Sequence, residues 1–486
     1  MTVHLHEVAV THRGRVLVDV TDVRLDRGRA LTVVGESGSG KSLLAHAAMG
    51  TLAAGLDAHG SMTVDGVRHD VADQVSRRPL WGRTLALLPQ EPVLALDPTM
   101  RARDVVAEGA PTFRRDRRAA RRTALERLSG IGVGHAAGAY PHQLSGGMAQ
   151  RVAFAAATVG DAPVLVADEP SKGLDPVARA DLAELLRSHV RDGGALLTIT
   201  HDLDLARALG GDVLVMRDAE ILERGPVEQV LTSPVHPYTQ RLLAAEPSRW
   251  TKGWMRTAAP QDDGRTLLVR ADGVARVLGG RRLFDDLTVE LRAGDRVALT
   301  GPSGSGKTTL GRVLLRQHPV DAGRVHHTGL GRTRGRAPVQ QLHQDPTQSF
   351  PARVPLRVAL GDAVRRHRLD PMRLTELLGT LRLDGALLER RPGAVSGGEL
   401  QRLAIIRAML LHPRLLLADE PTSRLDLLTQ EDTLDALMTQ VEAHGTALLM
   451  VTHDVALADV VADRSVALAS GLPAGDRVPR ATVAAH

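Results

Sequence analysis

Four segments of the chain carry apolar side chains at nearly every position. They are VLVA at 164–167, ALLTIT at 195–200, LLLA at 415–418 and ALLMVT at 447–452. A half-exposed strand alternates apolar and polar side chains, whereas a strand that is covered on both faces does not. The segments therefore predict a mainly parallel sheet with helices on both faces, which is an α/β fold.

The same series of landmarks occurs twice along the chain. Residues 31–44 (LTVVGESGSGKSLL) match residues 297–310 (VALTGPSGSGKTTL), and each copy runs from a short apolar strand through a glycine-rich loop into a helical pattern. Further landmarks follow in the same order, namely Gln90, Ser145, Asp168, Asp175 and His201 in the first copy and Gln344, Ser396, Asp419, Asp426 and His453 in the second. The sequence thus predicts two tandem domains of one fold.

The two copies differ in length between the loop lysine and the glutamine. That interval is 49 positions in the first copy and 37 in the second, whereas the interval from serine to aspartate is 23 in both. We expect the residues missing from the second copy to belong to a peripheral hairpin rather than to the core sheet.

Composition divides the chain into four parts. The first domain is expected over residues 1–246 and the second over 265–470. Residues 247–264 (PSRWTKGWMRTAAPQDDG) are a stretch of Pro, Ser, Trp, Gly and Asp residues and are interpreted as a linker. Residues 471–486 are expected to form a disordered tail.

Composition also excludes several classes of protein. The 486 residues include no cysteine, which rules out disulfides, zinc–thiolate sites and cysteine-ligated iron–sulfur clusters. We see neither a signal peptide at the N-terminus nor an apolar run long enough to span a membrane. The net charge of +5 is spread along the chain and does not by itself indicate a nucleic acid partner.

Lysine is rare in this chain, and its positions point to phosphate chemistry. Of 61 basic residues only four are lysine, and two of these, Lys41 and Lys307, lie in the glycine-rich loops. Both loops fit the pattern G-x-x-x-x-G-K-[ST], in which backbone N–H groups surround phosphate oxygens at a helix N-terminus. A compact ammonium group fits between phosphate oxygens where a planar guanidinium does not. A chance glycine turn is the alternative for one such loop, but not for two.

The predicted phosphate-binding positions are those of the two loops. They are Gly35, Ser37, Gly38, Gly40, Lys41 and Ser42 in the first copy and Gly301, Ser303, Gly304, Gly306, Lys307 and Thr308 in the second. In this pattern the lysine reaches the β- and γ-phosphates and the following hydroxyl binds Mg²⁺.

Two adjacent carboxylates end an apolar strand in each copy, in VLVADE and LLLADE. Neighbouring side chains of a strand point in different directions, so one acid can bind a metal while the next faces a water molecule. We therefore expect Asp168 and Asp419 to bind Mg²⁺ and Glu169 and Glu420 to polarise the attacking water. The alternative, an exposed strand end that bears two acids, is disfavoured because each strand leads straight into Pro and a turn.

The remaining candidate positions also recur. His201 and His453 each end an apolar strand, where a lone histidine is more often structural, but their recurrence favours a contact with the γ-phosphate. LSGGMAQR at 144–151 and VSGGELQR at 395–402 place a serine and two glycines before a helical run, which is an arrangement that binds anions. These helix tips contain Ser145, Gly146, Gly147, Ser396, Gly397 and Gly398.

The order of these motifs along most of the chain resembles that of ATP-binding cassette (ABC) ATPases. The resemblance implies two tandem P-loop NTPase domains of the ABC ATPase type, each with a mainly parallel sheet core, an antiparallel β subdomain and a helical subdomain. It also implies ATP and Mg²⁺ as cofactors, with Gln90 and Gln344 acting in catalysis and in the Mg²⁺ shell.

In this family two cassettes close head to tail, so each ATP lies between the loop of one and the SGG helix tip of the other. The resemblance therefore implies two composite sites within this chain. One combines Lys41, Gln90, Asp168, Glu169 and His201 with Ser396 and Gly398, and the other combines Lys307, Gln344, Asp419, Glu420 and His453 with Ser145 and Gly147. Asp175 and Asp426 resemble the residues that link the two sites in this family.

One family feature is missing. Relatives usually stack adenine on an aromatic side chain about 23 residues before the loop, and the corresponding positions here are His12 and Leu278. We expect base stacking to be weak or to be replaced by apolar contact.

Further motifs resemble the ATPases of oligopeptide, dipeptide and nickel importers. QEPVLALDPTMR at 90–101 and SPVHPYTQRLL at 233–243 resemble the first ATPase of such systems, and QDPTQSFPAR at 344–353 resembles the second. The alternative for SPVHPYT is a turn with prolines before a surface helix. The second half shows no HPYT segment, so its C-terminal region is expected to be trimmed.

The importer resemblance implies two membrane permease subunits and an extracytoplasmic solute-binding protein as partners, with the chain at the cytoplasmic face of the membrane. The resemblance leaves two classes of transported solute as alternatives, namely peptides and nickel or metal chelates. An ABC exporter and a soluble factor that acts on ribosomes or DNA are the alternatives. The short linker and the lack of cysteine disfavour the soluble factor. The arginine-rich run at 113–127 is expected to be a solvated helix face, with attraction to anionic lipid headgroups as the alternative.

Overall fold

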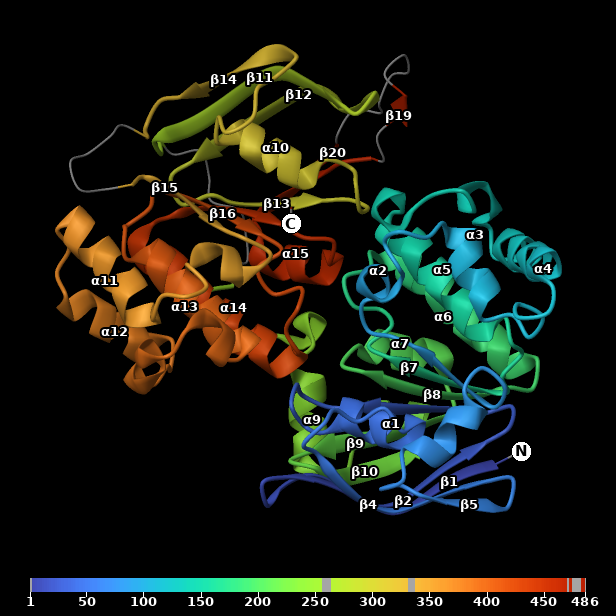
Figure 1. Ribbon diagram of the computed structural model, residues 1–486. Helices are drawn as coiled ribbons and strands as arrows, with labels where there is room; N and C mark the ends of the chain where they lie inside the picture. Colours follow the sequence, from blue (N-terminus) through green and yellow to red (C-terminus); the bar gives the residue numbers. More distant parts are fainter. Residues whose placement is uncertain (1, 256–263, 331–336, 470–471, 474–481, 486) are drawn as a thin grey trace. The chain divides into compact units, whose positions relative to one another are not determined.

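The computed structural model describes residues 2–255, 264–330, 337–469, 472–473 and 482–485 (Figure 1). The chain divides into two compact units, Met1–Ala244 and Ala245–His486. Each unit contains one four-stranded and one six-stranded sheet.

The six-stranded sheet of the first unit has the order β10-β9-β3-β8-β7-β6. The five strands from β9 to β6 are joined by four parallel pairings, and only β10 runs antiparallel, against β9. Every residue of the three central strands is buried, which explains their continuous apolar sequences. The strands are β3 (Ala30–Val34), β6 (Leu85–Leu88), β7 (Val164–Asp168), β8 (Ala195–Thr200), β9 (Asp212–Arg217) and β10 (Glu220–Pro226).

An antiparallel sheet of order β2-β1-β4-β5 forms the second layer of this unit. Its strands are β1 (Thr2–His12), β2 (Arg15–Asp26), β4 (Asp57–Val64) and β5 (Val67–Asp70). Helix α1 (Lys41–Met49) lies between the two sheets and buries Leu44, Ala47 and Met49 against them (Figure 1).

The remaining helices of the first unit cover the large sheet and extend it into a helical subdomain. That subdomain comprises α2 (Pro92–Ala95), α3 (Ala102–Glu108), α4 (Arg117–Gly130) and α5 (Gly146–Thr158), with 3₁₀ turns at η1 (Val75–Leu80), η2 (Gly134–Ala136) and η3 (Pro141–Gln143) preceding or connecting its helices. The other helices are α6 (Pro176–Arg191), α7 (Leu203–Leu209), α8 (Val227–Thr232) and α9 (Pro237–Ala244).

The second unit repeats this plan. Its six-stranded sheet has the order β15-β16-β17-β13-β18-β20, and its antiparallel sheet has the order β14-β11-β12-β19. The strands are β11 (Leu267–Leu278), β12 (Arg281–Arg292), β13 (Arg296–Thr300), β14 (Ala322–His327), β15 (Val339–Leu342), β16 (Leu415–Asp419), β17 (Ala447–Val451), β18 (Arg464–Ala467), β19 (Leu472–Pro473) and β20 (Thr482–Ala485).

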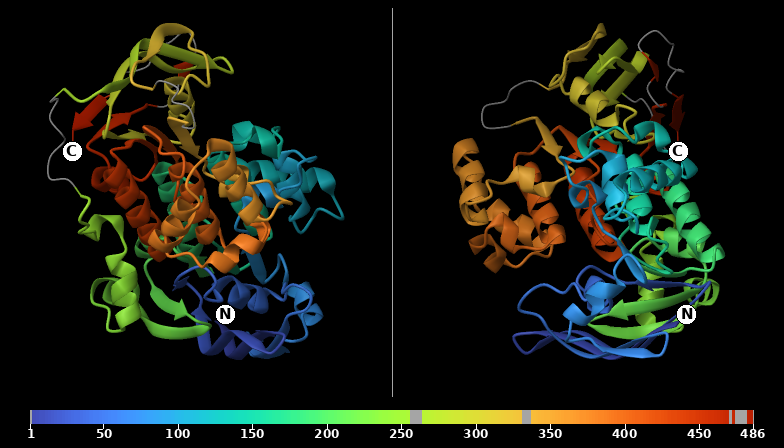
Figure 2. Two further views of the ribbon diagram at one scale, coloured as in Figure 1. Left: turned by 90° about the vertical axis from the view of Figure 1, so that its left-hand side faces the viewer. Right: turned by 45° about the vertical axis from the view of Figure 1, so that its right-hand side comes forward.

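Helix α10 (Lys307–Leu314) of the second unit takes the place of α1, and the other helices lie on the far side of the large sheet (Figure 1 and Figure 2). They are α11 (Leu356–His367), α12 (Met372–Thr380), α13 (Gly397–Met409), α14 (Leu427–His444) and α15 (Val455–Val461), with 3₁₀ turns η4 (Pro247–Arg249), η5 (Pro346–Ser349), η6 (Gly385–Glu389) and η7 (Pro392–Ala394). The predicted fold class is confirmed in both units.

The shortening of the second copy falls at an edge of the antiparallel sheet. In the first unit β5 pairs with β4 at that edge, and η1 follows. The corresponding edge strand of the second unit is β14, and the described residues between β14 and β15 form no further strand. The core sheet keeps six strands in both units, in agreement with the expected loss of a peripheral hairpin.

Residues 247–255, the first half of the predicted linker, pack on the second unit. Trp250 and Trp254 are 5% and 8% exposed and belong to the same apolar core as α13 and α14. The Lys252 ammonium lies 2.6 Å from a Glu431 carboxylate oxygen, and Trp254 Nε1 donates to Asp435 Oδ1 (2.8 Å). Two tryptophans therefore fix a segment whose other residues are typical of a linker. Residues 256–263 lie outside the described residues.

Parts of the predicted tail are strands in the structure. Residues 472–473 form β19, and residues 482–485 form β20, which pairs antiparallel with β18 as β10 pairs with β9. The rest of 471–486 lies outside the described residues. Among the helices of the described segments, none combines the length and the apolar composition needed to cross a bilayer.

Candidate functional site

A glycine-rich loop connects strand to helix at the same place in both units, β3 to α1 and β13 to α10. Gly35 begins the first loop with φ 152°, and a Cβ there would lie 2.0 Å from the Met216 carbonyl oxygen. Gly301 begins the second loop with φ 136°, and its Cβ would lie 2.3 Å from the Leu468 carbonyl oxygen. Glycine is therefore required where each loop passes the neighbouring strand.

Each loop folds around its lysine. Lys41 is buried, and its Nζ donates to the carbonyl oxygens of Gly35 (2.9 Å) and Glu36 (2.7 Å) and to Ser39 Oγ (3.3 Å). Lys307 donates in the same way to the carbonyl oxygens of Gly301 (2.7 Å) and Pro302 (2.8 Å). Carbonyl oxygens of each loop thus hold the ammonium group at the N-terminus of α1 or α10, and a helix N-terminus is a place suited to phosphate.

The hydroxyl after each lysine meets the aspartate that was predicted from the sequence. Ser42 Oγ donates to Asp168 Oδ1, and Thr308 Oγ1 donates to Asp419 Oδ1, both at 2.9 Å. Burial raises the pKa of Asp168 and of Asp419, and the hydroxyl hydrogen bonds act against that rise. In each unit a hydroxyl oxygen from the first turn of a helix and a carboxylate oxygen from the end of a strand lie next to each other. Such a pair of oxygen ligands fits Mg²⁺.

The glutamate after each aspartate lies beside the predicted histidine. His201 Nδ1 is 2.7 Å from Glu169 Oε2, and His453 Nδ1 is 3.0 Å from Glu420 Oε1. Both glutamates have φ 46°, a left-handed conformation that is uncommon for residues other than glycine. Their N–H groups nevertheless continue the sheet pattern and donate to the carbonyl oxygens of Ile199 and Val451. The sharp bend turns each carboxylate away from the strand and toward its histidine.

The charges around Glu420 favour its ionised form. Burial alone would raise the pKa of Glu420, but the hydrogen bond and charge of His453 and the charge of Lys307 outweigh that effect and lower it. Gln344 Nε2 also donates to Glu420 Oε2 (2.9 Å). Gln344 therefore contacts the predicted water-polarising group, while Gln90 follows β6, the neighbour of β7, at the same edge of its sheet.

Both SGG sequences cap a helix, as the sequence predicts. Ser145 Oγ accepts the N–H of Met148 at the start of α5, and Ser396 forms a reciprocal capping box with Glu399 at the start of α13. Both serines are exposed, as are Gly146 and Gly397. These tips are thus free of their own unit's core and available to an anion.

The last glycine of each SGG sequence allows close packing of two helices. A Cβ at Gly398 would lie 2.4 Å from Thr429 Cγ2, and one at Gly147 would lie 3.1 Å from Ala178 Cβ. Asp175 and Asp426 directly precede the neighbouring helices α6 and α14, and their carboxylates cap these helices by accepting N–H groups from the first turn. The structure therefore gives both aspartates a capping role within their own unit.

The positions expected to face adenine lie at the ends of two equivalent strands. His12 ends β1, and its Nδ1 is 2.9 Å from the Gly55 carbonyl oxygen. Leu278 ends β11 and is 52% exposed. Neither position offers the broad aromatic face of a Tyr or Trp.

Some contacts of the first loop were not anticipated from the sequence. Tyr238 Oη accepts the N–H of Glu36 (3.1 Å), and Arg217 lies over the Tyr238 ring, 4.9 Å from its centre. His46 Nε2 is 3.8 Å from Asp168 Oδ2. The HPYT motif was the available signal for Tyr238, but its sequence carried no indication of which segment it contacts.

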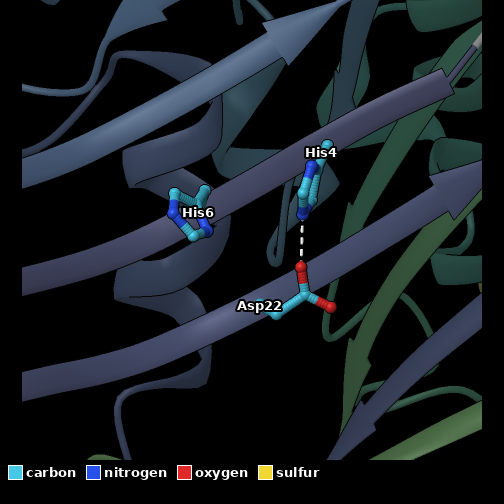
Figure 3. Close-up of side chains that lie close together, drawn as sticks. All are labelled: His4, His6 and Asp22. Carbon is cyan, nitrogen blue, oxygen red and sulfur yellow. Dashed lines mark hydrogen bonds and ion pairs between the residues drawn. The ribbon is translucent and has the colours of Figure 1, made fainter.

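A second group of titratable side chains lies on the antiparallel sheet of the first unit. Figure 3 shows His4 and His6 on β1 beside Asp22 on β2, with ligand atoms within 4.8 Å of one another. His4 Nε2 is in contact with Asp22 Oδ1, and Arg224 lies 3.7 Å from Asp22 Oδ2. His4 and Arg224 thus both pair with Asp22, while His6 Nε2 lies 3.9 Å from Glu7 Oε1.

The phosphate loops, the carboxylates and the histidines define each unit as a P-loop nucleotide-binding domain. The ABC transporter family matches residues 18–172 and 284–423, and the chain belongs to this family. ABC ATPases bind and hydrolyse ATP to drive transport, and the chain is a member with two cassettes.

Curated relatives extend over almost the whole chain. The "Peptidoglycan transport ATP-binding protein YejF" of Agrobacterium fabrum is 33% identical and covers 97% of this chain and 90% of its own length. The "Glutathione import ATP-binding protein GsiA" of Pectobacterium atrosepticum is 32% identical, with coverages of 92% and 81%. Both are ATP-binding proteins of transport systems by name.

Solved structures share the fold of the whole chain. The "RNase-L Inhibitor" is 21% identical with a TM-score of 0.66, and the alignment covers 98% of this chain and 90% of that one. A ribosome-bound archaeal ABCE1 gives a TM-score of 0.70 at 21% identity, with coverages of 98% and 78%. At this identity the likeness shows the fold alone.

Proposed function

We propose that the chain is the ATP-hydrolysing subunit of an ABC importer and works through two composite ATP sites. In each site a loop lysine holds the β- and γ-phosphates, while Ser42 or Thr308 shares Mg²⁺ with its aspartate. Glu169 and Glu420 polarise the attacking water, and His201 and His453 contact the γ-phosphate. The exposed SGG tip of the other cassette completes each site.

The observation that carries this proposal is the presence of the same set of catalytic groups in both units. Asp168, Glu169 and His201 meet at the carboxyl edge of one six-stranded sheet, and Asp419, Glu420 and His453 meet at the same edge of the other. Neither set lacks a glutamate or a histidine, so both sites are expected to turn over.

The bound nucleotide supplies the energy, and Mg²⁺ supplies charge neutralisation at the phosphates. The residues of this chain orient the nucleotide and the groups that act on it. The loops orient the triphosphate, and the left-handed backbone at Glu169 and Glu420 sets each carboxylate beside a histidine. Gln344, which donates to Glu420, helps to orient that carboxylate.

We propose that the solute is a peptide or a peptide-like molecule. The named relatives transport peptidoglycan material or glutathione, and both of these contain amino acids joined by amide bonds. The motifs QEPVLALDPTMR and SPVHPYTQRLL point the same way, with nickel or a metal chelate as the other solute class of that importer group. Two permease subunits and an extracytoplasmic binding protein would complete the importer, with this chain at the cytoplasmic face of the membrane.

The experiment is reconstitution with the permeases and the binding protein in proteoliposomes. Release of phosphate should rise on addition of a binding protein loaded with peptide, and labelled peptide should accumulate inside. Stimulation by a nickel chelate instead would change the solute class. Stimulation by ribosomes or DNA without membrane partners, or outward solute movement, would overturn the importer proposal.

A further inference from the structure

The HPYT segment of the first unit forms a small structure that several hydrogen bonds hold in place. Glu223 of β10 accepts the N–H groups of Val235 (2.8 Å) and His236 (3.1 Å). His236 Nδ1 in turn accepts the N–H of Tyr238 (3.1 Å), which fixes its tautomer with the proton on Nε2. Pro237 begins α9, a position that needs no N–H.

These contacts place one side chain, that of Tyr238, against the phosphate loop. Tyr238 is 4% exposed, and its hydroxyl accepts the N–H of Glu36, the second residue of the loop. The guanidinium of Arg217 covers the tyrosine ring and lies 3.3 Å from the Glu36 carboxylate. Because the Glu36 carbonyl accepts from Lys41, this residue is held at its N–H, its carbonyl and its side chain.

The second loop has a different residue at this point. Pro302 stands where the first loop has Glu36, and proline has no N–H to donate. Both tyrosines of the chain, Tyr140 and Tyr238, precede residue 245, so the second unit contains none. The proline ring fixes φ by itself and thus restricts the second loop from within.

We propose that Tyr238 is a positioning residue of the first nucleotide site, which holds the start of the phosphate loop in its binding conformation, as Pro302 does in the second. This inference rests on the proposed binding of nucleotide at the two loops. A loop that contains several glycines must be ordered when phosphate binds, and a bond that orders it beforehand improves affinity. The HPYT segment thereby stabilises the phosphate loop of the first ATP site.

The test uses the full chain and measures binding of trinitrophenyl-ATP with Mg²⁺. In Lys307→Ala only the first loop keeps its lysine, so the Kd reports on that loop. In Lys41→Ala only the second loop keeps its lysine, so the Kd reports on the second. In the Lys307→Ala background, Tyr238→Phe should raise Kd about 3- to 10-fold, the equivalent of one hydrogen bond. In the Lys41→Ala background the same substitution should leave Kd unchanged. Tyr140→Phe is the matched control and should change neither.

Rescue separates a positioning role from a merely structural one. Adding Glu36→Pro to Tyr238→Phe should return Kd at the first loop to within about twofold of its starting value, because the ring replaces the lost hydrogen bond. An unchanged Kd in Tyr238→Phe would overturn the inference, as would equal weakening at both loops or the lack of rescue. If the chain with both lysines replaced still binds the probe normally, the proposed nucleotide sites themselves fail.

Discussion

His201 and Glu169 face each other across two adjacent strands, with 2.7 Å between Nδ1 of the histidine and Oε2 of the glutamate. His453 and Glu420 repeat the pair at 3.0 Å. In both cases the glutamate has the same left-handed backbone, so the geometry is a property of the fold rather than of one copy.

Replacement of both glutamates tests their role in polarising water. Glu169→Gln together with Glu420→Gln should retain ATP binding and slow phosphate release by about 10²–10⁴-fold, the usual contribution of a general base. Phosphate release and nucleotide retained after gel filtration are the two measurements. Turnover near the unmodified rate would contradict the assignment.

Replacement of the loop lysines by arginine tests the fit of the ammonium group. Lys41→Arg and Lys307→Arg should each weaken trinitrophenyl-ATP binding at their own loop by at least about tenfold, because the planar guanidinium does not fit between the backbone carbonyls. Lys252→Arg, which keeps the ion pair with Glu431, is the control and should bind normally.

Separation of the halves tests the composite sites. Residues 1–244 and 245–486 prepared as two chains should each hydrolyse ATP slowly and regain activity on mixing, because in the proposed composite sites each half lacks the SGG tip of the other. The measurement is phosphate release against the concentration of the partner half. Full-rate hydrolysis by the first half as a monomer, confirmed by light scattering, would refute the composite arrangement.

The packing of Trp254 predicts a loss of stability in the second unit. Trp254→Ala should lower the free energy of unfolding by about 3–5 kcal/mol, the usual effect of removing a buried aromatic side chain. Trp254→Phe keeps most of the packing and should cost less. Urea unfolding followed by circular dichroism gives both values, and Met372→Ala, at a position that is 62% exposed, is the control.

The charge of Glu223 predicts a pH-dependent contribution to stability. Burial opposes ionisation, but hydrogen bonds from Thr239, Val235 and His236 outweigh it and lower the pKa of Glu223. A lowered pKa stabilises the folded state above the unfolded value of about 4.3 and loses that effect as the pH falls through the folded value. The melting temperature of the unmodified chain should exceed that of Glu223→Gln at pH 7, and the gap should narrow below about pH 4.3 and close as the pH falls through the lowered pKa of the folded state. A gap that widens on acidification would contradict this.

The sequence predicted the fold, and it predicted which candidate side chains lie at the edge of each sheet, because both depend on local patterns that occur twice. Continuous apolar strands predicted the parallel sheets, and G-x-x-x-x-G-K-[ST] predicted the loops around Lys41 and Lys307. The meeting of Ser42 with Asp168 also followed from the motifs, because parallel strands bring their carboxyl ends to one edge of a sheet.

Contacts between distant segments were not predictable in this way. The hydrogen bond from Glu36 to Tyr238 joins residues 202 positions apart, and no local pattern relates them. The burial of Trp250 and Trp254 was obscured by the polar residues around them. One aromatic side chain in the first case and two in the second determined the packing of a segment whose average composition indicated a surface loop.

The packing of residues 247–255 leaves very little chain to serve as a hinge. Helix α9 of the first unit ends at Ala244, and the turn η4 of the second begins at Pro247. The chain therefore passes from the helix that carries Tyr238, the residue that contacts the first phosphate loop, to the tryptophan segment packed in the second unit through residues 245 and 246 alone.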